Sequence, residues 1–422
     1  MRHLYSGLLY LITPCVVLRL LWRSRRAPDY RRRWGERFGW VPVRDQPCVW
    51  LHAVSVGEVQ AAAPLIEWLL ARGEAVLVTT TTPTGSERVR SLFGGRVAHC
   101  YLPYDLPGAV ARFLKRIRPR LGVIMETELW PNLFRACRRA EVPLVLANGR
   151  LSERSAAGYR RLGGLAREVV RDLSVIIAQG QADAGRFLSL GAEPERVRVS
   201  GNIKYDLSFQ PGTKTQAGIL RRMWGEARPV WIAASTHAGE DEPILEAHAR
   251  VRRRLPEALL VLVPRHPERF DAVAELCARR GCPVVRRTEW RACERGTQVF
   301  LGDTMGELPM MYAASDVAFV GGSLVPTGGH NVLEPAALGV PVVVGPHIFN
   351  FAAISDALIA AGAAVRVMDA GELAGAVHTF LVDPDARRSA GARGAAWVAN
   401  NRGALRRVQD IVEAFLVGAW RG

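Results

Sequence analysis

Residues 317–346, VAFVGGSLVPTGGHNVLEPAALGVPVVVGP, decide the fold of their part of the chain. An apolar run at Val317–Val320 leads into a loop with four glycines, and a second apolar run follows at Val340–Val344. Between the two runs, a short helix is expected to carry Asn331 and Glu334. This order predicts a strand–loop–helix–strand unit, which is typical of α/β folds.

The glycine-rich loop of this unit is expected to bind a phosphate, because backbone N–H groups and a helix N-terminus favour negative charge. Asn331 and Glu334 are three residues apart and would share a helix face. A phosphate would repel Glu334, so this carboxylate suits ribose hydroxyls, and a nucleotide-linked donor is the natural ligand. The alternative is an ordinary crossover whose glycines only form turns. That alternative does not explain Asn and Glu at helix-opening positions.

Composition narrows the class of protein. A chain of 422 residues with 49% hydrophobic residues predicts a folded protein of two domains. The 56 basic and 40 acidic residues give a net charge of +16, which suits nucleic acid, anionic lipid or a phosphorylated substrate. No nucleic-acid-binding motif with interleaved aromatic residues is visible, so nucleic acid is not an expected partner. Seven cysteines without CxxC spacing indicate a reducing compartment and no zinc site.

The N-terminus carries a membrane signal. The largely apolar stretch Leu4–Trp22 would form a helix roughly 28 Å long, close to the ~30 Å hydrocarbon core. Pro14 and Arg19 interrupt it, so a spanning helix and an interfacial anchor both remain open. No small-residue cleavage site follows, which argues against a removed signal peptide. The basic residues after the stretch are expected on the cytoplasmic side; they are Arg23, Arg25, Arg26, Arg31, Arg32, Arg33 and Arg37.

From about residue 48, short apolar runs alternate with helical stretches such as Val59–Leu70, Gly108–Arg116 and Leu133–Ala140. This alternation predicts a mostly parallel sheet with helices on both faces. The expected strands of the first half are Cys48–His52, Ala75–Thr79, Ala98–Tyr101, Leu121–Met125, Leu144–Ala147 and Val175–Ala178.

The alternation of strand and helix patterns is interrupted at Leu207–Arg228 and then resumes, which predicts two similar α/β halves. The expected strands of the second half are Val230–Ala234, Leu259–Pro264, Pro283–Arg286, Gln298–Leu301, Val317–Val320 and Val340–Val344. The predicted organisation is an anchor and Arg-rich segment at 1–37, domains at 38–209 and 229–402, a linker at 210–228, and a C-terminal helix at 403–422 that returns to the first domain.

Ligands of such sheets bind at the carboxyl ends of the strands, and polar residues gather there in the first half. Glu58, with Ser55 and Gly57, opens the helix after the first strand. Glu58 is either a dipole-favoured helix-opening residue or a general base for an attacking hydroxyl. His52 is expected to be a satisfied strand-end histidine.

Later strands of the first half end in further candidates. Glu126 and Glu128 follow the fourth strand, where Glu126 is expected to orient a substrate hydroxyl or to hold an adjacent arginine. Arg150 follows the fifth strand and offers an anion contact. Lys204 is one of only three lysines, and it suits a point-charge contact with a carboxylate or phosphate.

The second half shows the same arrangement. Ser235, Thr236 and His237 follow its first strand and offer hydroxyls and amides. Arg265, between Pro264 and a second proline, could stack on a base or pair with phosphate. The backbone of Met305 and Gly306 could read a base edge. No P-loop, HExxH or DxD-like pair lies near these loops, so phosphate charge is expected to be neutralised by Arg, Lys and helix dipoles without a metal ion.

Seven motifs together resemble the bacterial 3-deoxy-D-manno-octulosonic acid (Kdo) transferase family. They are HAVSVGEV, ETELWPN, GNIKYD, ASTHAGE, VPRHPERF, GDTMGEL and GGSLVPTGGHNVLEPAALG, and they run through most of the chain. Val332 departs from the proline common in relatives. The resemblance implies a GT-B glycosyltransferase fold, with two Rossmann-like domains and an active site in the cleft between them. It also implies transfer of Kdo from CMP-Kdo to the lipid A precursor, at the cytoplasmic face of the inner membrane, with no cofactor and no metal.

By the same resemblance, Glu58 is the general base, the first domain binds the acceptor and the second binds the CMP-sugar. The implied CMP contacts are Pro264, Arg265, Met305, Gly306, Glu307, Asn331, Val332, Leu333 and Glu334. Lys204 and Ser55 are candidates for the Kdo carboxylate or the acceptor phosphate. Two rivals remain: another membrane-associated GT-B enzyme that uses a UDP-sugar, and a basic membrane-surface or nucleic-acid-binding protein.

Overall fold

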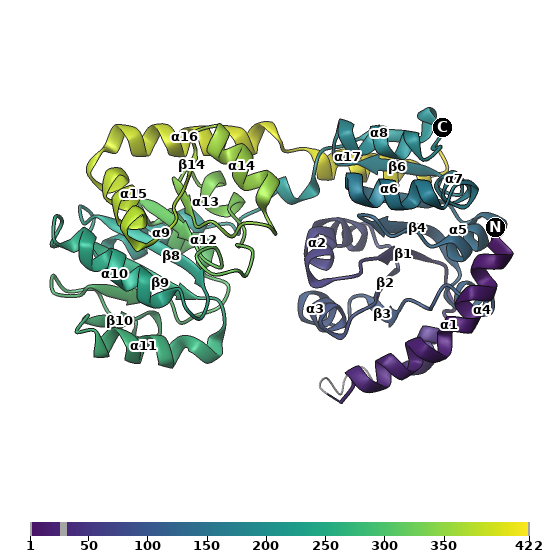
Figure 1. Ribbon diagram of the computed structural model, residues 1–422, viewed down its shortest axis with the longest axis horizontal. Helices are drawn as coiled ribbons and strands as arrows, with labels where there is room; N and C mark the ends of the chain where they lie inside the picture. Colours follow the sequence, from purple (N-terminus) through teal and green to yellow (C-terminus); the bar gives the residue numbers. More distant parts are fainter. Residues whose placement is uncertain (1, 26–31, 421–422) are drawn as a thin grey trace. The chain divides into compact units, whose positions relative to one another are not determined.

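The computed structural model describes residues 2–25 and 32–420, so Arg26 and Arg31 of the expected basic cluster lie outside the described residues. The chain forms two compact units. Unit 1 consists of Met1–Asp206 and Arg402–Gly422, and unit 2 of Leu207–Asn401. Each unit contains a sheet covered by helices, as Figure 1 shows.

The sheet of unit 1 has seven parallel strands in the order β3-β2-β1-β4-β5-β6-β7. The order reverses between β1 and β4, and in such sheets ligands bind at the carboxyl ends of the strands at this reversal. The strands are β1 Cys48–His52, β2 Val76–Thr80, β3 Ala98–Tyr101, β4 Pro119–Met125, β5 Leu144–Gly149, β6 Val175–Ala178 and β7 Val197–Val199.

The sheet of unit 2 is also parallel, in the order β10-β11-β9-β8-β12-β13-β14, and reverses between β8 and β12. The expected strands of both halves are present. The edge strands β7 and β14 were missed because their sequences, VRV and AVR, contain an arginine and most of their residues are not buried, so neither forms a clear apolar run. The strands are β8 Val230–Thr236, β9 Leu259–Pro264, β10 Val284–Arg286, β11 Val299–Leu301, β12 Val317–Val320, β13 Val342–Val344 and β14 Ala364–Arg366.

Side chains of successive strand residues point to opposite faces, so each sheet has a core on both sides. In β1, Trp50 packs in the core on one face, while Val49 and Leu51 pack in the core on the other. The helices of unit 1 are α2 Val56–Ala71, α3 Pro83–Phe93, α4 Pro107–Ile117, α5 Pro131–Arg139, α6 Glu153–Arg161, α7 Gly164–Arg171, α8 Gln181–Ser189 and α17 Ala404–Leu416. The helices of unit 2 are α9 Thr213–Trp224, α10 Asp241–Arg252, α11 Phe270–Arg279, α12 Leu308–Ala313, α13 Leu333–Ala337, α14 Ala352–Ala360, α15 Ala370–Val382 and α16 Pro384–Asn400.

The expected linker at 210–228 requires correction. Most of it forms α9, whose Ala217, Leu220 and Trp224 are buried in the core of unit 2. Their spacing of three and four residues places them on one helix face. The segment is therefore part of unit 2, and the boundary of unit 1 lies at Asp206.

Helix α17 packs on unit 1 although it lies at the far end of the chain. Its Ala404, Val408 and Val412 are fully buried against the core on the α2 face of the sheet. The Asp206 carboxylate accepts hydrogen bonds from the backbone N–H groups of Gly403 (2.5 Å) and Leu405 (2.6 Å). Asp206 thus satisfies free donors at the start of this helix.

The apolar N-terminal segment forms α1, Arg2–Arg23, which differs from an ordinary surface helix in that its exposed side is largely apolar. Polar side chains face the protein, because Arg2 pairs with Asp172, Tyr5 donates to Asp105 (3.0 Å) and Ser6 donates to Asn132 (3.1 Å). Apolar side chains are exposed instead; they include Leu4, Leu8, Leu11, Ile12, Leu18 and Trp22. By length and composition, Arg2–Trp22 could cross a membrane, since an 18-residue window within it has a mean hydropathy of 1.7.

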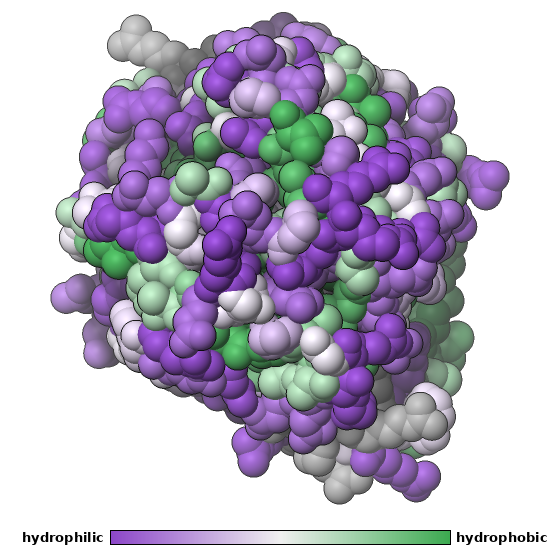
Figure 2. Space-filling model, turned by 90° about the vertical axis from the view of Figure 1, so that its left-hand side faces the viewer, coloured by the Kyte–Doolittle hydropathy of each residue, from purple (hydrophilic) through white to green (hydrophobic). Residues whose placement is uncertain are grey.

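The surface of unit 2 has a different character. Figure 2 shows one of its faces, which is mostly hydrophilic with small, separate apolar patches. Isolated apolar side chains of this kind are normal on a soluble surface. The continuous apolar stripe of α1 is therefore the feature that points to a lipid environment.

Candidate functional site

Glu58 lies in the first turn of α2, after β1 at the strand reversal of unit 1. Its carboxylate accepts hydrogen bonds from Val54 N–H (2.8 Å) and Ser55 Oγ–H (3.0 Å), while Ser55 Oγ accepts from Glu58 N–H. Ser55 thus caps the helix while Glu58 reaches back to the residue before the cap, so Glu58 does have the structural role considered as the alternative to a base. Burial nevertheless raises the pKa of Glu58, and the charge of Glu126 raises it further. A raised pKa suits a carboxylate that must accept a proton near neutral pH.

Glu126 follows β4, the neighbour of β1, and has a left-handed backbone with φ of 55°. Its carboxylate pairs with Lys204 Nζ at 2.9 Å. Non-glycine residues in this region of φ and ψ are strained, and such strain often marks a functional site. The structure thus joins two predicted residues that are 78 positions apart.

Glu128 completes a group of three carboxylates. Burial raises the pKa of Glu128 to about 7, and the charge of Glu58 contributes to this shift. Burial and the charge of Glu128 in turn raise the pKa of Tyr159. The sequence shows the two carboxylates of the ETE motif, but it does not show that burial would raise the pKa of Glu128.

The remaining predicted site residues of unit 1 differ in their exposure to solvent. Gly57 is exposed, and an added Cβ there would approach only Ser55 Oγ, at 4.0 Å, so the space beside it is open. Arg150 is exposed at the end of β5, and within residues 2–25 and 32–420 no hydrogen bond or ion pair joins it to the carboxylates. His52 is fully buried and its Nδ1 contacts Thr79. Burial lowers the pKa of His52 to about 4. The expectation of a satisfied histidine is met only at Nδ1, which lies 2.9 Å from the Thr79 hydroxyl, because the buried Nε2 has no hydrogen-bond partner among the described residues.

In unit 2, a buried carboxylate occupies the glycine-rich loop. Glu240 accepts hydrogen bonds from four backbone N–H groups, those of His237 (2.8 Å), Gly322 (2.6 Å), Ser323 (3.0 Å) and Leu324 (2.9 Å). The prediction that this loop offers its amides to a phosphate is therefore wrong for residues 322–324. Glu240 takes the place of the anion and joins the loop after β8 to the loop after β12.

Two histidines meet where these loops join. His237 Nε2 lies 2.7 Å from His330 Nε2, and the two rings are nearly parallel, at 8°. His266, after β9, contacts the His237 ring edge-on with centroids 5.4 Å apart. His330 was not predicted as a site residue, although it stands in the quoted GGHN motif.

Arg265 and Glu334 form the polar part of this site. The backbone N–H of Arg265 donates to Thr236 O (3.0 Å), and its exposed guanidinium acts electrostatically on His237, His330 and Glu334. Burial raises the pKa of Glu334, while a hydrogen bond from Asn331 (3.1 Å) and the charge of Arg265 oppose this shift. The structure thus brings together residues predicted from two separate motifs.

Several predicted site residues of unit 2 have side chains that are buried in the protein, so only their backbone groups could contact a ligand. The side chains of Pro264, Val332 and Leu333 are buried. Thr236 is fully buried and its hydroxyl donates to Asp241 (2.7 Å). Ser235 has a left-handed φ of 58°, and a Cβ at Gly321 would lie 2.7 Å from Ser235 O, which requires glycine there.

The loop after β11 presents its backbone. Glu307 is held by two hydrogen bonds from Arg287 (2.9 and 3.0 Å) and one from Thr304 (2.5 Å). Met305 is exposed, and Gly306 has a φ of 85°. Glu307 therefore supports the turn that displays the backbone of Met305 and Gly306.

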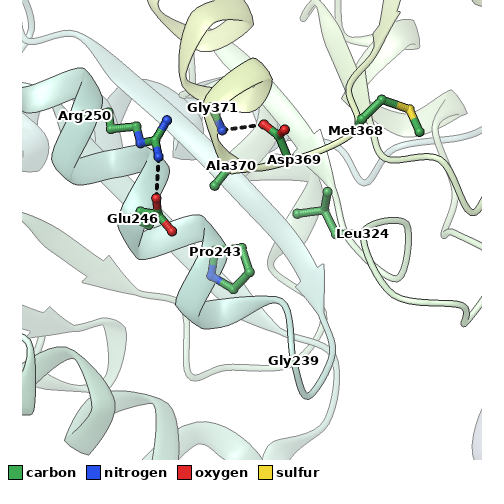
Figure 3. A pocket seen from close by; sticks show the side chains of 9 residues that line it. All are labelled: Gly239, Pro243, Glu246, Arg250, Leu324, Met368, Asp369, Ala370 and Gly371. Carbon is green, nitrogen blue, oxygen red and sulfur yellow. Dashed lines mark hydrogen bonds and ion pairs between the residues drawn. The ribbon is translucent and has the colours of Figure 1, made fainter.

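A cavity of about 490 Å³ lies elsewhere in unit 2, between the start of α10 and the start of α15. Figure 3 shows its lining, including the Glu246–Arg250 ion pair and Asp369, which accepts from Gly371 N–H. Asp369 already caps α15, so this helix end offers no anion site. The cavity contains none of the predicted site residues.

Comparison with known proteins decides the family. Residues 32–207 match the family model described as 3-deoxy-D-manno-octulosonic-acid transferase (kdotransferase). A 3-deoxy-D-manno-octulosonic acid transferase of Haemophilus influenzae is 42% identical over 98% of this chain and 99% of its own length. The chain belongs to the Kdo transferase family. A second member, from Bordetella pertussis, is 39% identical over 98% of this chain and 99% of its own length.

The fold of this Kdo transferase family member also has solved counterparts. A glycosyltransferase from Rickettsia africae covers 88% of the chain and 99% of its own, with a TM-score of 0.55 and 13% sequence identity. The two α/β units therefore form a GT-B fold, which confirms the predicted fold class.

We expect Glu240→Gln to destabilise unit 2, because the amide NH₂ would face two backbone donors. A buried group left without its partner costs roughly 1–3 kcal/mol. Glu246→Gln is the matched control, since Glu246 is half exposed in an i,i+4 ion pair and should change the free energy of unfolding by less than about 0.5 kcal/mol. Denaturant unfolding measures both variants. Equal stability of the two variants would contradict the role of Glu240.

Proposed function

We propose that this protein is an inverting glycosyltransferase that moves Kdo from CMP-Kdo to a lipid A precursor. The observation that carries the proposal is the group Glu58, Glu126 and Lys204, assembled at the strand reversal of unit 1 in a Kdo transferase fold. It supplies a carboxylate of raised pKa beside a cation. A glycosyl transfer to a hydroxyl needs a base of this kind.

Glu58 would act as this base. The acceptor hydroxyl gives its proton to the Glu58 carboxylate while its oxygen forms a bond to the anomeric carbon of Kdo. The bond from that carbon to the phosphate oxygen breaks, and CMP departs with the electron pair. Attack on the side opposite the leaving group inverts the anomeric carbon. Lys204, oriented by Glu126, would hold the carboxylate of Kdo or a phosphate of the acceptor.

The site in unit 2 would hold the CMP part of the donor. Glu334 is positioned by Asn331 to accept hydrogen bonds from ribose hydroxyls. Arg265 offers positive charge and the neighbouring histidines offer N–H donors to the phosphate. The displayed backbone of Met305 and Gly306 would contact the cytosine edge.

Helix α1 would attach the protein to the inner membrane at its cytoplasmic face. We propose that it lies in the interface and does not cross the bilayer. A crossing helix would have to break the contacts of Arg2, Tyr5 and Ser6 with unit 1 and carry these polar groups into hydrocarbon. In the interface, the same contacts persist while the exposed leucines enter the acyl region and nearby arginines meet anionic lipid.

Incubation with CMP-Kdo and a lipid A precursor, followed by mass spectrometry, tests the function. We expect a product heavier by one or more Kdo residues, inhibition by CMP but not by UDP, and unchanged turnover in EDTA. Inhibition by UDP alone would favour a UDP-sugar donor. Loss of turnover in EDTA that Mg²⁺ restores would contradict metal-independent transfer.

We expect Glu58→Gln to lower kcat by roughly 10²–10⁴-fold, the usual contribution of a general base. Glutamine retains a carbonyl oxygen for the Val54 N–H, and the cap itself is made by Ser55, so the change removes the base without removing the helix cap. CMP binding, measured by calorimetry, should be unchanged because it belongs to unit 2. Glu128→Gln is the matched control, and a larger loss in that variant than in Glu58→Gln would assign the base to Glu128.

We expect replacement of Leu8 and Leu11 by Glu to release the protein from vesicles of anionic phospholipid. Burying one leucine contributes about 1.5–3 kcal/mol, so the double change should weaken binding by more than tenfold. Tyr5→Phe is the control, because Tyr5 faces unit 1 and its loss leaves the exposed stripe intact. Flotation of the vesicles measures binding.

Protease access to an N-terminal tag on vesicle-bound protein distinguishes the two modes of attachment. An interfacial helix leaves the tag outside, where it is cleaved. A tag that is protected until detergent is added would show that α1 crosses the bilayer.

A further inference from the structure

The contact between His237 and His330 requires a particular distribution of protons. Their Nε2 atoms are 2.7 Å apart, which is a hydrogen-bond distance. One nitrogen must therefore carry a hydrogen and the other must accept it, because two bare nitrogens or two N–H groups would repel each other. In the free protein the pair shares a single proton on this contact.

The surrounding backbone holds the pair in place. His237 and His330 follow β8 and β12, which are adjacent at the strand reversal of unit 2. The backbone N–H of His237 is bound by buried Glu240. Gly322 packs against both rings, since a Cβ there would lie 3.1 Å from His330 Nε2 and 3.5 Å from His237 Cδ2. The short contact is thus built into the join between two loops.

The charges that face the pair are mostly positive. Arg265, Arg269 and His266 come from the loop after β9, and Glu240 at the start of α10 is the opposing carboxylate for His237. Burial lowers the pKa of His237 and lowers that of His330 to about 4, and the charge of Arg265 contributes to both shifts. The pair is therefore uncharged at neutral pH in the free protein. An anion bound beside it would raise the pKa of the pair.

We propose that His237 and His330 take up one proton when a phosphate group binds beside Arg265, so that the occupied site carries a positive charge that the free site lacks. The inference rests on the proposed function, which places the donor phosphate there. The proton comes from solvent, and the phosphate keeps its own ionisation state. A cationic N–H donor then replaces a neutral one, and such charge-assisted hydrogen bonds are roughly twice as strong.

This uptake would help the transfer step. Breakage of the bond between the anomeric carbon and the phosphate oxygen turns a singly charged phosphodiester into the doubly charged phosphate of CMP. A protonated pair stabilises the added charge without passing its proton to the sugar. The two histidines would then act on the leaving group, while Glu58 acts on the acceptor.

Calorimetric titration with CMP at pH 7.5, in two buffers with different ionisation enthalpies, measures the proton uptake. At this pH the phosphate of CMP is almost fully ionised, because its second pKa is about 6. We expect nearly one proton taken up per CMP bound, none with cytidine, and CMP affinity that falls as the pH rises.

Variants assign the uptake to the pair. We expect His330→Gln and His237→Gln, which retain a polar side chain but cannot hold the proton, to abolish the uptake and to weaken CMP about tenfold. Cytidine binding should be unchanged. His378→Gln, on α15, is the control and should behave as the native protein. Uptake that persists in His330→Gln, or that disappears only in His266→Gln, would overturn the inference.

Two outcomes with the native protein distinguish a failure of the proton-uptake inference from a failure of the proposed function. CMP binding without proton uptake would overturn the role of the pair and leave the proposed function standing. A native protein that forms the Kdo product but does not bind CMP would overturn the donor-site assignment, and the role of the pair with it.

Discussion

The buried carboxylate of Glu240 is the interaction on which the geometry of unit 2 depends. Its two oxygens accept hydrogen bonds from four N–H groups in loops more than 80 residues apart. Without this carboxylate, the loop after β12 would have buried donors with no partner, and each costs roughly 1–3 kcal/mol. Because Glu240 fixes both loops, His237 and His330 meet, and Asn331 is held at the start of α13.

Both units have local backbone strain next to the strand reversal, in unit 1 after β4 and in unit 2 in β8. Glu126 follows β4 and Ser235 lies near the end of β8, and both have left-handed backbones. Each such residue costs about 1–3 kcal/mol, which the packed sheet beneath must offset. At Ser235 the altered backbone lets Gly321 approach within contact distance. At Glu126 it accompanies the pairing of the side chain with Lys204. The strain therefore occurs where the chain must leave the sheet to form the site.

The sequence predicts most of this architecture, since apolar runs and their spacing are local properties. Residues placed after the strands, such as Glu126 and Lys204, do lie together because parallel strands end at one edge. The failures concern partners distant in sequence. No local pattern shows that Glu240 would occupy the amides of Gly322 and Ser323, or that α9 would pack as core. A polar linker and an amphipathic helix differ only in the face that the rest of the fold covers.

The charge in each unit suits a different half of the reaction. In unit 1 burial raises the pKa of Glu58 and the charge of Glu126 raises it further, while hydrogen bonds and the cation Lys204 oppose this only in part. A base surrounded by arginines would have a depressed pKa and would hold a proton poorly. In unit 2 burial and the charge of Arg265 lower the pKa of His237 and of His330, so the positive charge of the free site is that of the arginines. Because each sheet sets the charge of its own loops, one chain can hold a basic carboxylate and an anion site without either neutralising the other.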